Sequence, residues 1–299
     1  MSSKRDRAKH LIITADDFGA SVPINEAVEL GHRNGILTSA SLMITGKAAE
    51  DAVERARRLP HLGVGLHLTL IDGHPQLPAS QVSELVGRDG RFFSSELPVV
   101  LRLTLFARAR AQAEAEIRAQ LEAFRRTGLP LDHVDGHHHL HLHPQIQRIL
   151  VRLAPEFGIR HVRVPHEPFR TAWRATHDRW LLRLASALFV GSLSGAMRRR
   201  FGRARIAGND QVLGLVDSGH MRPERLKAFL RALPDGVSEL YLHPATRRAG
   251  PLDTLPADYE PEAEYAALID AGVRQTCAES GARLTTFGAL AAAAAGARA

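Results

Sequence analysis

The sequence predicts an α/β protein built as a (β/α) barrel, and three observations support this fold class. Short apolar segments rich in β-branched residues alternate with longer amphipathic segments, which indicates a parallel sheet covered by helices. Several predicted strands end in acidic, histidine or arginine residues, as expected where strand ends build a barrel site. A glycine-rich dinucleotide motif and a phosphate loop are both missing from the sequence, which disfavours an open doubly wound sheet.

The composition is that of an ordinary globular protein. With 299 residues, 44% hydrophobic and 24% charged, we expect one barrel domain over 1–299 with insertions at about 72–98 and 169–206. The net charge is +7, but no basic and aromatic nucleic-acid motif is found, so we expect no nucleic-acid partner. A single cysteine, Cys277, excludes an intramolecular disulfide framework and favours a reducing cytoplasm. The charged N-terminus and the short apolar run after it predict no signal peptide there.

The first part of the chain predicts three buried strands. Residues 10–15 form an apolar run that ends in Asp16 and Asp17, and adjacent acids are costly to bury without a cation or partner. The third strand carries one imidazole, His67, on the face of Gly63 and Gly65, which leaves room for a group to approach the backbone. The predicted elements are strands at 10–15, 36–44 and 62–70, and helices that begin near Pro23 and cover 47–59 and 99–127.

A histidine-rich stretch, residues 133–143, follows the start of a fourth strand predicted over 131–137. It holds six of the sixteen histidines, and its internal position excludes an expression tag. Histidine is the commonest metal ligand, so the stretch indicates a metal site. If the stretch is extended, alternation places these residues on one face: His133, Asp135, His137, His139, His141 and His143.

The second half continues the alternation of helices and strands. A helix is predicted from Pro144 to Gly158, followed by a fifth strand at 159–164 that carries Arg163. A later strand ends in His243. The remaining predicted elements are strands at 211–213, 237–242 and 283–285, and helices at 223–232, 261–279 and 288–296, which brings the sheet to about seven parallel strands.

The segment 169–206 differs from the rest in composition. It contains both tryptophans, Trp173 and Trp180, together with nine arginines and one acidic residue, Asp178. Helical spacing of its apolar residues predicts one or two basic helices. Such helices can lie on an anionic membrane surface; alternatively they pack on the body of the protein or at a homodimer contact.

The polar strand ends suggest a single divalent-metal site. One carboxylate and two neutral imidazoles leave open positions for water, and Asp17, His67 and His137 can supply this set from three strands. Asp16 is then a candidate general base, and His243 a candidate acid that protonates a leaving group. The ligand set suits zinc, while iron, manganese, nickel and magnesium remain open.

Five motifs give the chain a resemblance to a known family. They are TADDFG at 14–19, NGILTSASLM at 34–43, GLHLTL at 65–70, HVDGHHHLH at 133–141 and LHP at 242–244. Together they resemble the YdjC-type carbohydrate deacetylases, relatives of the NodB-type polysaccharide deacetylases on a distorted (β/α) TIM-like barrel. The resemblance implies removal of an acetyl group from an N-acetylated amino sugar, with Asp17, His67 and His137 as metal ligands. Two positions depart from the family: Gly136, where serine is common, and Ala245, where glycine is common.

A narrower resemblance concerns a subgroup of that family. TADDFGAS with the following INEAV, and DGHHHLHLHP, are similar to the deacetylases associated with hopanoid biosynthesis (HpnK-like). The substrate this implies is a hopanoid lipid carrying N-acetylglucosamine. We therefore expect a cytoplasmic protein that contacts the inner face of the membrane through 169–206, where Trp173 and Trp180 help to form the substrate pocket.

The expected reaction is metal-assisted amide hydrolysis. Asp16 takes a proton from water, His243 protonates the departing amine, and Arg163 orients Asp16 and keeps it ionised. His139 and His141 are expected to shape the sugar pocket. Three alternatives stay open: a deacetylase of soluble chitooligosaccharides, another metal-dependent amidohydrolase or phosphoesterase, and a non-catalytic histidine-rich metal-binding protein.

Overall fold

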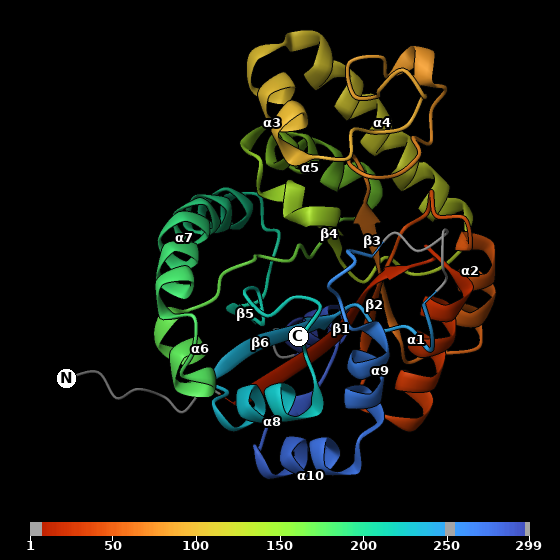
Figure 1. The fold of residues 1–299 in the computed structure, drawn as a ribbon. Coiled ribbons are helices and arrows are strands. Elements are labelled where there is room, and N and C mark those ends of the chain that lie inside the picture. Colours follow the sequence, from red (N-terminus) through yellow and green to blue (C-terminus); the bar gives the residue numbers. More distant parts are fainter. Residues whose placement is uncertain (1–7, 249–254, 297–299) are drawn as a thin grey trace.

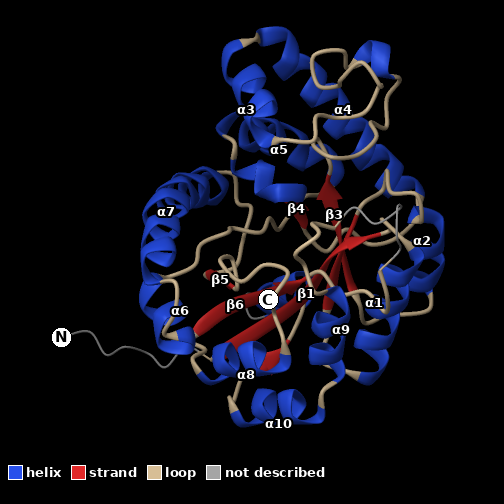
Figure 2. Cartoon of the chain, in the orientation of Figure 1, coloured by secondary structure: helices blue, strands red, loops and turns tan. Residues whose placement is uncertain are grey.

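A curved parallel sheet surrounded by helices forms the framework of the protein. The computed structural model describes residues 8–248 and 255–296. Six strands follow the order β4-β3-β2-β1-β6-β5, and β7 pairs with the start of β1; all pairings are parallel. Helices cover the outside of the sheet, with α1, α2, α8 and α9 around its lower half and α3, α4 and α5 above it (Figure 1, Figure 2). The predicted distorted (β/α) barrel is confirmed, in the form of a sheet curled into a half-barrel.

The elements have the following bounds. The strands are β1 Lys9–Phe18, β2 Ser39–Leu42, β3 Gly63–Leu68, β4 Val134–Gly136, β5 Gln211–Leu213, β6 Gly236–Leu242 and β7 Arg283–Leu284. The helices are α1 Val22–Asn34, α2 Ala49–Arg57, α3 Glu96–Leu105, α4 Ala107–Arg126, α5 Pro144–Phe157, α6 Phe169–Thr176, α7 Trp180–Arg203, α8 Pro223–Arg231, α9 Pro261–Ile269, α10 Ala271–Glu279 and α11 Phe287–Gly296. Two short 3₁₀ helices are η1 Ala79–Gln81 and η2 His137–Leu142.

Alternation along the central strand separates the core from the site. On β1, Leu11 and Ile13 belong to the hydrophobic core, whereas Thr14 and Asp16 bond to polar side chains inside the curve of the sheet. Successive side chains of a strand point to opposite faces, so one strand serves both layers. The outer, apolar face of the sheet thus packs against the helices, and the inner, polar face carries the residues of the candidate site.

The prediction of a regular strand at 159–164 is wrong, although these residues do lie beside β4 at the sheet. Val162 makes isolated bridge contacts only, and the Val134 amide donates to the His161 carbonyl at 3.0 Å on the β4 side. On the other side, the Asn209 side chain accepts from the Val164 amide at 2.7 Å and donates to its carbonyl at 2.9 Å. A side-chain amide thus takes the place of a neighbouring strand, and Pro165 has no amide to extend the ladder.

Two predicted helices are each divided in the structure. The helix predicted at 99–127 begins earlier, at Glu96, and is interrupted at Phe106, whose backbone is extended (φ −108°, ψ 124°). The helix predicted at 261–279 is divided at Asp270, whose side chain accepts the Val273 amide at 2.7 Å and caps α10. An Asp that can cap an N-terminus favours a new helix start over a continuous helix.

The histidine-rich stretch is not extended beyond Gly136, so the predicted alternation is wrong for its second half. His138 and His139 both have φ 52°, inside the 3₁₀ helix η2. His141 is turned back beneath the end of β4, where its Nδ1 lies 3.1 Å from the position of a Cβ on Gly136. A serine at 136 would press on this ring, which gives a local reason for the glycine in this chain.

We predict that His141 makes folding stability depend on acid pH. Burial lowers the pKa of His141 to about 4, whereas an unfolded histidine titrates near about 6.5. Between these values the unfolded chain binds more protons, so stability falls as pH decreases. When the pH decreases from 7 to 5, the free energy of unfolding of the His141→Gln variant should therefore fall by about 2 kcal/mol less than that of the wild type.

Urea unfolding at both pH values measures this difference. The matched control is His61→Gln, because His61 is exposed; it should follow the wild type. An identical loss of stability in the His141→Gln protein and the wild type would contradict the prediction.

Candidate metal and active site

A backbone irregularity at the end of β1 brings two adjacent carboxylates to the same site. The pairing of β1 with β2 changes register between Ala15 and Phe18, and Asp17 has φ 60°. Neighbouring strand residues otherwise point to opposite faces. The irregularity therefore allows Asp16 and Asp17, which are 2% and 1% exposed, to serve one site.

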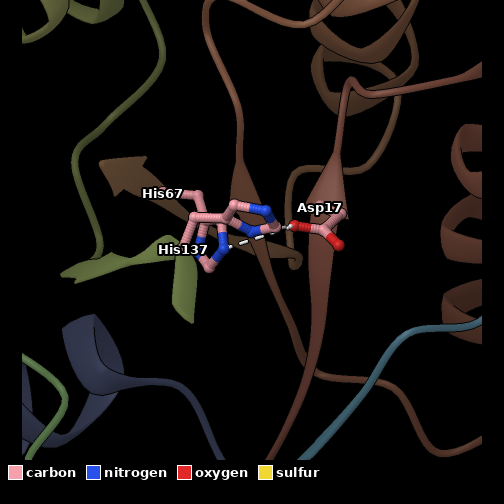
Figure 3. Close-up of side chains that lie close together, drawn as sticks. All are labelled: Asp17, His67 and His137. Atoms are coloured by element: carbon pink, nitrogen blue, oxygen red, sulfur yellow. Dashed lines mark ion pairs between the residues drawn. The ribbon is translucent and has the colours of Figure 1, made fainter. Parts of the chain in front are cut away.

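Asp17, His67 and His137 converge as predicted (Figure 3). Asp17 Oδ1 lies 3.3 Å from His67 Nε2 and 3.0 Å from His137 Nδ1. One ligand atom from each residue falls within 4.8 Å of the others, and all three residues are buried. They come from the ends of β1 and β3 and from the first residue of η2, so residues far apart in sequence form a single cluster.

The hydrogen-bonding state of this cluster fits a divalent cation. His67 Nδ1 is 2.8 Å from Asp135 Oδ1, which leaves the lone pair of Nε2 toward Asp17 when the imidazole is neutral. Asp17 Oδ1 and His137 Nε2 are buried with no hydrogen-bond partner among the described residues. Asp17 Oδ1 faces His67 Nε2 and His137 Nδ1 without a hydrogen bond to either, and a cation held by these three atoms would remove the cost of burying an unpartnered acceptor.

Protons would compete with a metal ion for the side chains of this cluster. Burial disfavours a charged imidazole, yet Asp135 and Asp17 raise the pKa of His67 well above its ordinary value. Burial likewise opposes ionisation of Asp17, but His137 and His67 hold the pKa of this carboxyl well below its usual range. A metal that replaces the proton would bind more tightly as pH rises, because the imidazole must be neutral to ligate.

Arg163 organises the carboxylates around the cluster. Its guanidinium makes two bonds to Asp16, of 2.6 and 2.7 Å, which confirms the predicted proximity of these two residues. It also lies 2.8 Å from Asp135 and 2.9 Å from Glu239, and it is fully buried. A planar fork of donors that is satisfied on three sides fixes the orientation of Asp16.

His243 lies beside this site with one free nitrogen. Its Nδ1 is buried without a partner in the described part of the chain, and its ring packs on Tyr241 and Tyr259. Burial lowers the pKa of His243, although Asp17 and Asp16 oppose the shift. The imidazole is therefore uncharged near neutral pH, and its backbone amide is held by Glu264 Oε2 at 2.5 Å.

The other predicted site residues are spread more widely. His139 Nε2 lies 3.3 Å from the Tyr241 hydroxyl, which places His139 at the same side as His243, whereas His141 Nε2 bonds to the Arg163 carbonyl at 3.1 Å. Trp173 stacks on Phe169 within α6, and Trp180 is half exposed at the start of α7. No contact joins either tryptophan to the metal cluster among the residues that the structure describes, so their pocket role stays a prediction.

A cavity lies beside the beginning of α7, between α6 and α8. It has a volume of about 600 Å³ and is lined by Arg179, His220, Arg222 and Glu260 among others. His220, which lines the cavity, has its ring centroid 6.2 Å from that of Tyr259, and the ring centroids of Tyr259 and His243 are 5.1 Å apart. The size is within the usual range of ligand pockets.

Three residues that hold candidate site residues in place were missed at the level of sequence. Asp135 was placed on the histidine face but without a role, and it orients both His67 and Arg163. Glu239 and Glu264 are fully buried and bond to Arg163 and to the His243 amide. For Glu239 a signal existed, because it shares the inner face of its strand with Tyr241 and His243 at a spacing of two. Glu264 lies on a helix, and no pattern in the sequence indicated its contact with His243.

Parallel strands, covering helices and a carboxylate-imidazole cluster at the strand ends define a barrel protein with a candidate metal site. Comparison with known proteins identifies the family. Residues 10–279 match the family described as YdjC-like protein, and the chain belongs to it. A mouse relative named "Carbohydrate deacetylase" is 34% identical over 246 residues, which cover 78% of this chain and 77% of the relative.

Other relatives match over shorter stretches. A carbohydrate deacetylase from Brevibacillus brevis is 40% identical over 149 residues, or 50% of this chain and 57% of the relative. Matches to those from Oceanobacillus iheyensis and Geobacillus stearothermophilus each cover 61% of the relative. A solved structure from Enterococcus faecalis, described as a "putative cellobiose-phosphate cleavage protein", has a TM-score of 0.73 and 22% identity over 95% of this chain and 99% of that one. This likeness concerns the fold.

We predict that Asp135→Asn weakens divalent-metal affinity about 10–100-fold, because His67 loses the carboxylate that orients its Nδ1–H. Titration calorimetry of the chelator-treated protein with Zn²⁺ or Mn²⁺ measures this. The matched control is Asp132→Asn, which removes a carboxylate 3.0 Å from another buried imidazole, His133, rather than from a ligand. Equal affinities in the two variants would show that Asp135 does not act through His67.

Proposed function

We propose that this protein is a metal-dependent carbohydrate deacetylase that hydrolyses the acetamide of an N-acetylated amino sugar. The observation that carries the proposal is the convergence of Asp17, His67 and His137 beside an Asp16 held by Arg163. Membership of the YdjC-like family, and the name of the relatives, support the same class of reaction.

The chemistry divides between the cluster and its neighbours. A divalent ion held by Asp17, His67 and His137 would polarise the acetyl carbonyl and acidify water. Asp16 takes the proton of the attacking water: two of its lone pairs face Arg163, and its carboxylate keeps others free. Arg163 holds this carboxylate in place by its two bonds, so little reorganisation is needed when the proton moves.

His243 completes the proton balance of the hydrolysis. Because burial lowers the pKa of His243, it enters the reaction uncharged. The proton that His243 gives to the departing amine is therefore supplied by the attacking water, taken up by Asp16 and passed on to His243, so that both side chains return to their initial states when the C–N bond breaks. An imidazolium of lowered pKa is a stronger acid than an ordinary one, which favours donation to that amine.

The geometry also weighs against two alternatives. A non-catalytic histidine-rich metal binder would use many imidazoles, yet His138 pairs with Glu96 and His141 with a backbone carbonyl. A phosphoesterase would need further carboxylates or a second ion, whereas Asp135 and Glu239 are bonded to Arg163. A single metal with a base beside it favours amide hydrolysis.

The narrower proposal concerns the substrate. The similarity of DGHHHLHLHP and TADDFGAS to the hopanoid-associated subgroup supports a hopanoid lipid that carries N-acetylglucosamine. A cytoplasmic location at the inner face of the membrane would suit such a substrate. Soluble chitooligosaccharides are the competing substrate class.

Acetate release measured with both substrate classes, with and without a chelator, tests the activity and its metal dependence. We expect release that stops with the chelator and returns with added metal, because the ion held by the cluster would polarise the acetyl carbonyl. Chelator-resistant release would contradict the metal role, and no release from either substrate class would contradict the deacetylase proposal.

We predict that Asp16→Asn lowers the rate of acetate release about 10²–10⁴-fold, because the general base is lost. Metal content should stay close to that of the wild type, since Asp16 is not among the proposed ligands. Glu239→Gln is the matched control, because it removes another carboxylate bonded to Arg163. An equal loss of rate in both variants would assign the effect to the Arg163 network and remove Asp16 from the base role.

A further inference from the structure

Exposed apolar side chains are concentrated on two helices. In the described part of the chain twelve large apolar residues are exposed, and ten of them belong to α3 with its C-cap or to α7. On α7 they include Leu188 and Phe189, which are 68% and 71% exposed; on α3 they include Leu97 and Leu105, at 66% and 65%. Soluble monomers rarely expose such contiguous groups without an interaction partner. The full set is Leu97, Leu101, Leu105, Phe106, Trp180, Leu181, Leu182, Leu184, Leu188 and Phe189.

The apolar face of α7 has arginines at both of its ends. Residues 184–197 contain no charged residue, while Arg174 and Arg179 precede this stretch and Arg199 and Arg203 follow it, all exposed. The one acidic residue of the region, Asp178, is engaged by Arg183 and Arg225 at 2.8 and 2.7 Å. The surface therefore combines apolar area with uncompensated positive charge.

The helix is long and apolar enough to cross a membrane, with 24 residues and only 17% of its most apolar window buried. It is nevertheless fastened to the protein along its length. Arg183 is buried and makes two bonds of 2.9 Å to Asp217, and Ser194 donates to the Pro165 carbonyl at 2.5 Å. Crossing a bilayer would break this buried pair, at a large cost. An orientation along the membrane surface retains it.

Both exposed faces flank the helix that carries a proposed metal ligand. On one side of η2, His138 lies 2.9 Å from Glu96 of α3, and His143 lies 3.1 Å from Thr104 of the same helix. On the other side, α7 packs against η2 and α5. Figure 1 shows α3 at the top and α7 at the left, with this region between them.

We infer that the exposed faces of α3 and α7 form a docking surface for an anionic lipid bilayer. Leucine and phenylalanine side chains would enter the boundary of the acyl chains, Trp180 suits the interface, and the flanking arginines meet anionic headgroups. Charge complementarity selects this occupant. A second copy of the chain would place one arginine-rich face against another and add repulsion.

Combined with the proposed function, on which this step rests, the surface brings the site next to lipid-linked sugars. An amino sugar attached to a membrane lipid could then reach η2 without leaving the bilayer.

Vesicle co-sedimentation of the full chain tests the docking surface. We expect the wild type to bind phosphatidylcholine–phosphatidylglycerol vesicles, and to bind pure phosphatidylcholine vesicles far less. L188E combined with F189E, and L101E combined with L105E, should each weaken binding at least about tenfold, because charged side chains replace the inserted ones. V22E combined with L284E changes the two other exposed apolar residues and should bind like the wild type.

Three results would overturn the inference: no binding by the wild type, equal binding by all variants, or light scattering that shows a dimer lost in L188E/F189E without vesicle binding. Acetate release from soluble chitooligosaccharides separates the two proposals. L188E/F189E should keep it at the wild-type level while losing release from vesicle-embedded glycolipid. Absence of all release in a wild type that binds vesicles would count against the deacetylase proposal alone.

Discussion

The site depends on the buried contact between Arg163 and the carboxylates of Asp16, Asp135 and Glu239. These residues come from β1, β4 and β6, so one guanidinium ties together three strands of the curved sheet. Removal of any one partner would leave charge buried without compensation, which is far more costly than loss of a surface pair. The same contact fixes the orientation of Asp16 and, through Asp135, that of His67. Fold and site are thus held by one set of bonds.

Charge balance explains why this arrangement calls for a cation. Around Arg163 and Asp17 there are four carboxyl groups and a single guanidinium, all of them buried. A proton on His67 can offset part of the excess, and a divalent ion can offset it while also satisfying the unpartnered Asp17 Oδ1. The proposed metal binding and the positions of the candidate ligands therefore follow from the same electrostatic requirement.

A second buried arginine has a comparable role at the surface. Arg163 and Arg183 are the two largest fully buried side chains in the described residues. Arg183 holds α7 against Asp217 and lies near Glu167, which in turn accepts the Gly214 amide at 2.7 Å. Because one face of α7 is fastened in this way, the opposite face is free to remain apolar and exposed. The buried ion pair thus makes the proposed bilayer contact compatible with a folded barrel.

The sequence by itself determined the barrel class and most of the strands and helices, and it predicted the residues that the structure brings together in the candidate site: Asp16, Asp17, His67, His137, Arg163 and His243. Periodicity and strand-end chemistry are local properties, so they could be interpreted without a structure. Tertiary structure decided what depends on partners distant in sequence. Asn209 replaced a strand neighbour beside Val164, positive φ angles turned His138 and His139 out of an extended path, and Asp135 gained its role only from contact with His67 and Arg163. Such contacts leave no periodic trace in the sequence, because each rests on a single side chain held from another part of the fold.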